Sequence, residues 1–250
     1  MKSKRKILAC SIGFAISAIL LSPYLQAATY KQFEIPIDLN WELSGENISS
    51  LVIDRRERSK EYRSILDLIK NKEFSVARKE IVEALSKRPR DSALYNLLGS
   101  LEAAKKNYNA AKDNYKKAVE LDNNYELPYL GLAEIAIFEK QFDRAKNYYT
   151  QLIRINSKNY GAYIVLSRLL YKEGEIQKAI DKLLEGYVQV KGSEVLEAKL
   201  LVILGQLYLV ENQPNKLLVL AKDLVSRYSM SVSALSILVL IALISSIFCR

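Results

Sequence analysis

The sequence predicts an all-α fold, a right-handed superhelical solenoid built from helix-turn-helix repeats. One observation is the scarcity of turn residues, since the 250 residues include only nine glycines and five prolines, which argues against a turn-rich β protein. The other is a short segment that returns along the chain at constant spacing. Because half of the residues are apolar, the chain has enough material to bury a core between such repeats.

The recurring segment is marked by an alanine flanked by charged and aromatic residues. This alanine occurs four times at equal intervals along the chain, as Ala77, Ala111, Ala145 and Ala179. An unrelated helical bundle would not require a constant period, whereas a solenoid of stacked helix pairs does.

Other positions keep the same period. An aromatic slot holds Tyr95, Tyr129 and Tyr163, and an apolar slot three residues later holds Leu98, Leu132 and Leu166. Between the two helices of each pair, a polar turn is expected at Lys106-Asn107, Lys140-Gln141 and Glu173-Gly174. Small residues would let the paired helices lie close together, and the large side chains would fill the groove between them.

With this period and this order of positions, the chain resembles the tetratricopeptide repeat (TPR) family. The resemblance implies copies at 58–91, 92–125, 126–159 and 160–193, and a shifted fifth at 198–231. The shift corresponds to about four extra residues within 191–197, which would lengthen a helix or a loop. In this family the first helices of the repeats line a concave groove in which partner segments bind.

Transferring that register predicts a set of partner-binding residues. Most of them are apolar, which favours an amphipathic helix or an apolar strip of a partner protein; Asn96 and Arg168 are the candidates for polar clamps. The alternative is that the apolar members only pack between helices. The set is Asn96, Ser100, Leu127, Leu130, Glu134, Ile137, Ile164, Arg168 and Tyr171.

The part of the chain that precedes the first copy does not match the repeat. Residues 1–28 combine a cationic head with the uncharged run 7–21 and small residues at 27–28, which predicts a signal peptide; an uncleaved N-terminal anchor is the alternative. Residues 29–57 are expected to form an extended arm that packs on the first repeat, because Phe33 to Leu39 alternates apolar and polar residues. A docking strand for a partner is the rival interpretation.

The C-terminal residues 232–250 allow two interpretations. The uncharged run 230–248 would reach about 28 Å as a helix, close to the thickness of a bilayer core. It could therefore be a transmembrane helix. The same residues also continue the repeat register, so they could form the first helix of a truncated sixth repeat.

Composition narrows the class of function. The sequence contains no histidine, which removes the commonest general base and the usual nitrogen ligand of zinc. We expect no catalytic residue, cofactor or metal. The formal charge of +9 falls to +5 without the four cations of the leader, an ordinary value that indicates no nucleic acid partner.

These observations predict a non-enzymatic scaffold or assembly factor of the bacterial cell envelope. It would lie on the periplasmic face of the inner membrane and bind a protein partner in its groove. Family resemblance suggests a role in surface-polysaccharide export or in protein export and sorting. The alternatives are a truncated fragment of a longer array, or an accessory subunit of an envelope enzyme.

Overall fold

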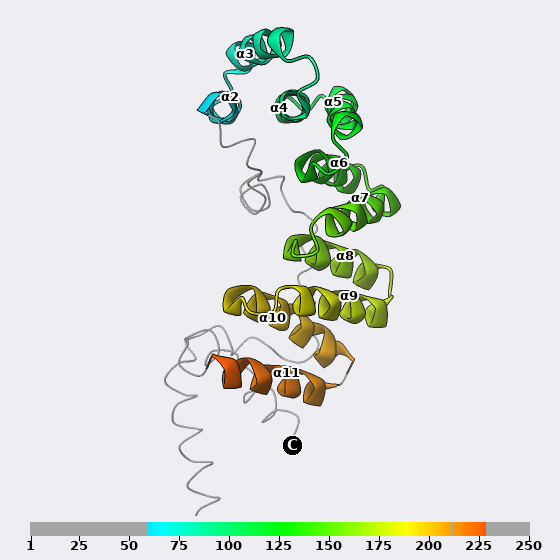
Figure 1. Cartoon of the computed structure of the whole chain (residues 1–250). Coiled ribbons are helices and arrows are strands. Elements are labelled where there is room, and N and C mark those ends of the chain that lie inside the picture. The colour runs from blue at the N-terminus through cyan, green and yellow to red at the C-terminus, as the bar shows by residue number, and fades with distance from the viewer. Residues whose placement is uncertain (1–59, 212, 229–250) are drawn as a thin grey trace, which may run out of the picture. The chain divides into compact units, whose positions relative to one another are not determined.

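The computed structural model describes residues 60–211 and 213–228, and these residues form helices joined by short turns. Figure 1 shows them as successive antiparallel pairs from α2 to α9. The prediction of an all-α fold of stacked helix pairs is confirmed. The first four pairs are α2 (Lys60–Lys70) with α3 (Phe74–Lys87), α4 (Ser92–Ala104) with α5 (Tyr108–Leu121), α6 (Glu126–Phe138) with α7 (Phe142–Ile155), and α8 (Tyr160–Lys172) with α9 (Ile176–Gln189).

The period of the recurring alanines reappears in the helix boundaries. α4, α6 and α8 begin at that same interval, and each has 13 residues. α5, α7 and α9 also begin at that interval, and each has 14 residues. Each helix contacts the next along the chain from α2 to α9, as expected when the connections are short.

The recurring alanines lie in the interior of the stack. Ala77, Ala111, Ala145 and Ala179 are all completely buried. Farther along each second helix, the buried positions continue with residues such as Ile81, Tyr115 and Tyr149. The repeated sequence pattern is therefore the contact surface of the second helices.

Each first helix from α2 to α8 ends in the same left-handed turn. Lys72, Lys106, Lys140 and Gly174 have positive φ angles between 59° and 82°. After α6, for example, the amide of Gln141 donates to the carbonyl of Ala136 at 2.7 Å, and that of Lys140 donates to Ile137 at 2.9 Å. This hydrogen-bond pattern is a Schellman motif. The equivalent turn in the fourth pair is therefore Gly174-Glu175, one residue later than Glu173-Gly174.

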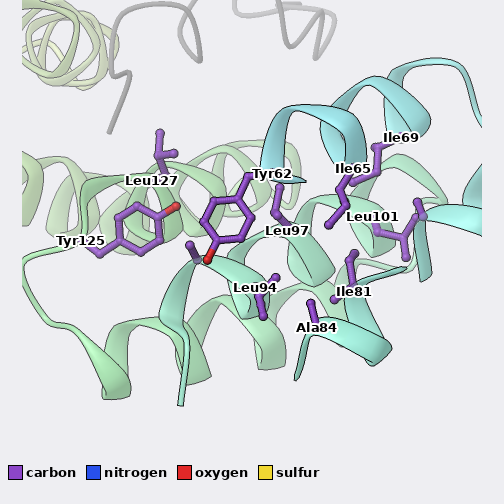
Figure 2. Close-up of a cluster of buried hydrophobic side chains, with 12 residues drawn as sticks. Tyr62, Ile65, Ile69, Ile81, Ala84, Leu94, Leu97, Leu101, Tyr125 and Leu127 are labelled. Atoms are coloured by element: carbon purple, nitrogen blue, oxygen red, sulfur yellow. The ribbon is translucent and has the colours of Figure 1, made fainter. Parts of the chain in front are cut away.

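Within residues 60–207, the first pair lies at one end of the stack. α2 buries three of its 11 residues, Tyr62, Ile65 and Ile69, whereas α6 buries nine of its 13. Figure 2 shows the cluster that covers this end, in which those three side chains meet Leu94, Leu97 and Leu101 of α4. An internal helix has neighbours on several sides and a terminal helix on fewer, as expected for a capping repeat.

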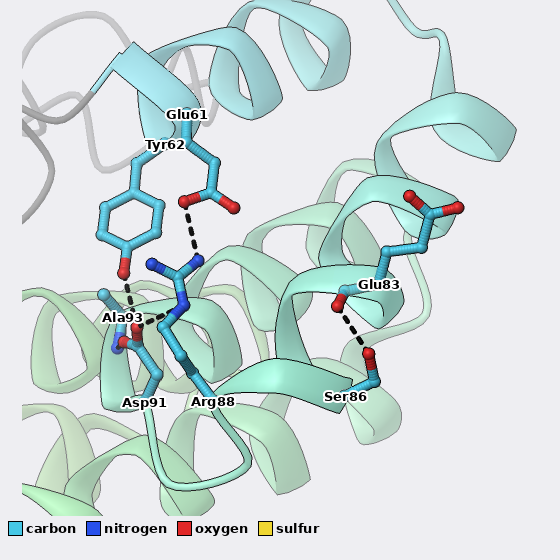
Figure 3. A network of polar contacts seen from close by, with 7 residues as sticks. All are labelled: Glu61, Tyr62, Glu83, Ser86, Arg88, Asp91 and Ala93. Atoms are coloured by element: carbon cyan, nitrogen blue, oxygen red, sulfur yellow. Dashed lines mark hydrogen bonds and ion pairs between the residues drawn. The ribbon is translucent and has the colours of Figure 1, made fainter.

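A polar network also joins the first pair to the second (Figure 3). The hydroxyl of Tyr62 donates to Asp91 Oδ2 at 2.5 Å, and Asp91 Oδ1 accepts from the amide of Ala93 at 3.0 Å as the N-cap of α4. Arg88 donates to Glu61 at 2.7 Å. Burial, with Asp91 as the next cause, raises the pKa of Tyr62 to about 12, so this hydroxyl stays protonated as a donor.

The last two helices of the described chain are α10 (Glu194–Val210) and α11 (Pro214–Arg227). α10 has 17 residues, four more than each of α4, α6 and α8, so the extra residues noticed at 191–197 lengthen this helix. The chain divides into two compact units: residues 60–207 form the described part of one, and residues 208–211 and 213–228 that of the other. In the second unit, Leu217, Ala221 and Leu224 of α11 are buried.

The signal peptide predicted at 1–28, the arm at 29–57 and the segment 232–250 lie outside the described residues. Between residues 60 and 228, leaving out residue 212, no helix has both the length and the apolar character needed to cross a membrane.

Candidate partner-binding groove

The first helices of the repeats form one side of the stack. α4 contacts both α2 and α6 directly, whereas within residues 60–207 no second helix makes a comparable contact with the second helix of the next pair. Farther along, Lys199 of α10 lies over the ring of Tyr160 of α8, 5.4 Å from its centroid. The first helices α2, α4 and α6 are thus closer together than the second helices beside them, and we take the side of the first helices as the inner side.

Six of the nine predicted partner-binding residues are half-buried on these inner helices. They are partly open to solvent, so a partner could reach them without unfolding a repeat. The six are Ser100 on α4, Glu134 and Ile137 on α6, and Ile164, Arg168 and Tyr171 on α8. We call these six residues the inner stripe.

The other three predicted residues are buried. Asn96, Leu127 and Leu130 are only 4%, 8% and 5% exposed. Leu127 packs in the cluster of the first repeats, and Leu130 in the cluster around Tyr149. Their side chains belong to the interior of the described structure. For the two leucines, the alternative of packing between helices describes the structure.

Within the inner stripe, Ser100, Glu134 and Arg168 occupy the same position in three successive repeats. The side chains that they meet differ. Ser100 Oγ accepts a hydrogen bond from the hydroxyl of Tyr115 at 3.3 Å and donates to the carbonyl of Asn96 at 3.1 Å. Glu134 and Arg168 make no hydrogen bond or ion pair with any residue that the structure describes.

Burial changes the ionisation of both charged groups. Removal from water raises the pKa of the Glu134 carboxyl group to about 7 and lowers that of the Arg168 guanidinium, because a poorly solvated site disfavours a charge. An arginine nevertheless stays protonated near neutral pH. The inner stripe therefore contains a cation, and an acid whose pKa is raised to about 7.

Tyr149 of α7 contributes a third polar group that the sequence did not suggest. Its side chain is 1% exposed, and its hydroxyl has no hydrogen-bond partner among the described residues. Burial and the nearby Glu134 both raise the pKa of this hydroxyl, so it remains a neutral donor. The sequence pattern places Tyr149 among the core residues. The one sequence signal of a further role is that Tyr149 is equivalent to Tyr115, whose hydroxyl contacts Ser100 of the stripe.

The apolar part of the stripe consists of Ile137, Ile164 and Tyr171, which are half-buried. Phe138, next in the chain to Ile137, is 55% exposed, and its ring lies 4.6 Å from that of Tyr108. In the described ranges 60–211 and 213–228, no group of three or more acidic, cysteine or histidine side chains could hold a metal ion. Apolar side chains beside a few polar groups are suited to binding a peptide.

Comparison with known proteins supports the repeat register. Models of the tetratricopeptide repeat match residues 92–125 and residues 130–194. A comparison of the sequence with curated proteins found no match.

Solved structures with the same arrangement include PilF of Pseudomonas aeruginosa, at 20% sequence identity and a TM-score of 0.50, with 69% of this chain and 77% of that chain covered. A structure of MamA is similar at 18% identity and a TM-score of 0.51, with 68% of this chain and 95% of that chain covered. At such low identity these similarities show a shared fold. The matched residues and the buried alanines show that residues 92–125 and 130–194 of this chain are tetratricopeptide repeats.

Proposed function

We propose that this chain is a non-enzymatic scaffold that holds a segment of a partner protein along the inner stripe of α4, α6 and α8. TPR proteins are protein-interaction scaffolds, and this chain shares their repeat. The observation that carries the proposal is the stripe itself, because its apolar and charged side chains are accessible on helices whose remaining surface is largely buried. A fixed row of such side chains on rigid helices suits recognition of a peptide.

The experiment places a photo-crosslinking amino acid at Ile164, in the middle of the stripe, in cells that produce the full chain. The matched control carries it at Lys116, an exposed residue of the second helix α5. We expect a discrete adduct from Ile164 that disappears when Ile137→Glu is added, while circular dichroism shows unchanged helicity. Equal adducts from both positions, or adducts insensitive to Ile137→Glu, would mean that the stripe does not bind a partner.

We also propose that the scaffold is exported and acts at the periplasmic face of the inner membrane. The support is the sequence of the two ends, a cationic head followed by an apolar run, and an uncharged run at 230–248. A role in surface-polysaccharide export, or in protein export and sorting, is part of this proposal. Protease accessibility in spheroplasts and carbonate extraction of membranes test it. A protein that stays protected inside spheroplasts would contradict export, and release by carbonate would contradict the anchor.

A further inference from the structure

The middle of the inner stripe contains three polar groups that nothing in the described chain satisfies. They are the carboxylate of Glu134, the hydroxyl of Tyr149 and the guanidinium of Arg168. The Tyr149 hydroxyl is buried, whereas the Glu134 and Arg168 side chains are half-buried. Buried polar groups in folded proteins are almost always hydrogen-bonded, so the Tyr149 hydroxyl needs an explanation. A ligand that is absent from the free chain is such an explanation, because it would supply the missing partners.

The neighbouring repeat shows what a satisfied version of this position looks like. There the hydroxyl of Tyr115 donates to Ser100 Oγ at 3.3 Å, and Ser100 Oγ donates to a carbonyl of its own helix. Tyr149 and Glu134 are the equivalents of Tyr115 and Ser100 one repeat later. In that pair the acid replaces the hydroxyl, and no hydrogen bond connects the two side chains. The hydrogen bond between Tyr115 and Ser100 in the second repeat thus has no counterpart between Tyr149 and Glu134 in the third.

One repeat farther along, the same position carries a positive charge instead. Arg168 of α8 occupies the place of Glu134 of α6, and the Tyr149 position is taken by Leu183, which offers no polar group. The stripe therefore presents an acid and then a base in successive repeats, with Ile137, Ile164 and Tyr171 as apolar neighbours on the same helices. Electrostatic complementarity requires an occupant with the opposite order of charges.

We infer that the groove recognises a partner segment that carries a basic side chain and an acidic side chain together with apolar residues. Its Lys or Arg binds the Glu134 carboxylate, and its Asp or Glu accepts hydrogen bonds from the Arg168 guanidinium. The Tyr149 hydroxyl donates to Glu134 once the cation has drawn the carboxylate into its ionised form. This inference rests on the proposed function and specifies the chemistry of the segment that is bound.

The probe is a phage library of short random peptides, displayed so that the peptide has no free C-terminal carboxylate. It is selected against the full chain and against the variants Glu134→Gln and Arg168→Met. Matched controls are Glu120→Gln and Arg154→Met, because both residues are exposed on second helices. Circular dichroism and thermal melts establish that each variant is folded. The strongest peptide is then synthesised and its affinity measured by titration.

We expect the natural chain and both controls to enrich peptides that contain a base and an acid among apolar residues. Glu134→Gln should remove the enrichment of the base, and Arg168→Met that of the acid. Each variant should weaken binding of the synthetic peptide by about 10-fold or more, as loss of a desolvated charge pair does. Exchanging the peptide's base for an acid should restore binding to Glu134→Lys. Tyr149→Phe should weaken binding a few-fold without lowering the melting temperature.

Two failures can be told apart. Peptides that need Ile164 but show no charge pattern would overturn this inference and leave the proposed function standing. A selection in which no peptide loses binding upon Ile164→Glu would contradict both. If sedimentation shows a dimer of the natural chain that Glu134→Gln dissociates, the occupant is a second copy of the chain and the assignment to a foreign segment is wrong.

Discussion

The ring of Tyr115 occupies the space where a side chain on Gly99 would begin, since a Cβ added to Gly99 would lie 2.5 Å from Cδ1 of that ring. The other edge of the ring lies equally close to Gly131, where an added Cβ would be 2.5 Å from Cε2. One tyrosine of α5 is thus held between a glycine of α4 and a glycine of α6. These glycines are needed for close approach.

Gly131→Ala should therefore destabilise the chain by about 1–3 kcal/mol, the usual effect of overpacking a dense interior. The buried Tyr115 ring cannot move aside as the end of a flexible side chain can. Urea denaturation measures the change. Tyr115→Leu, which removes the clash, should make the alanine less harmful, so the two substitutions should show a coupling energy. Strictly additive effects would mean that the ring is not what limits this position.

A lysine-to-glycine substitution should change stability in opposite directions in a left-handed turn and in the middle of a helix. Lys140 has a φ of 59°, which is unfavourable for a residue with a Cβ, so Lys140→Gly should stabilise the chain by about 0.5–1 kcal/mol. Lys116→Gly in the middle of α5 should destabilise it by about 1 kcal/mol. Gly174→Ala, at a φ of 82°, should also destabilise. Chemical denaturation tests all three, and destabilisation by Lys140→Gly would contradict the strain argument.

A partly buried ion pair connects two repeats. Lys112 Nζ of α5 lies 2.6 Å from Glu139 Oε1 at the end of α6, and the same position one repeat later pairs Lys146 with Glu173 at 2.7 Å. A double-mutant cycle of Lys112→Met and Glu139→Gln should give a coupling energy of about 1 kcal/mol that decreases with salt. The more exposed pair Lys117–Glu120 is the control and should give about 0.3 kcal/mol. Equal coupling in both cycles would argue against a contribution from burial.

The raised pKa of Glu134 predicts a pH dependence of stability. The folded chain releases this proton near pH 7, and the unfolded chain near the ordinary value of 4.5. Between these values the folded state binds the proton more tightly, so its stability decreases as the pH rises from 4.5 to 7. Glu134→Gln removes this dependence. Relative to the natural chain it should gain about 1–3 kcal/mol between pH 5 and pH 8.

Glu120→Gln is the control for this measurement, because Glu120 is exposed on α5. Among the groups that lie near Glu134, Tyr149 of α7 stays neutral over this range, since its pKa is raised. Arg168, which holds the equivalent position one repeat away on α8, stays charged. The change therefore belongs to Glu134. Parallel pH profiles for the natural chain and Glu134→Gln would show that this carboxyl group is not desolvated.

Much of the fold could be predicted from the sequence because its determinants are local and repeated. Ala77, Ala111, Ala145 and Ala179 recur on the second helices, and all four are fully buried. Each turn depends on a few neighbouring residues of the sequence. The repeat pattern nevertheless predicted the fourth turn one residue too early, at Glu173 instead of Gly174. The insertion before the fifth copy was visible as a shift of register, whereas its conversion into four extra residues of α10 required the structure.

The groove could be predicted only in part, because helical periodicity does not say which faces the neighbouring repeats cover. α6 is apolar around most of its circumference and buries nine of its 13 residues, so its pattern could not separate Leu127 and Leu130, which are interior, from Ile137, which is accessible. The sequence by itself determined the period, the helix pairs and the charged residues at the Ser100 position of successive repeats. The tertiary structure decided which of these polar side chains have a hydrogen-bond partner within the described chain. Packing satisfies Ser100 through Tyr115. It buries the Tyr149 hydroxyl and half-buries Glu134 and Arg168 without supplying a partner from the described residues.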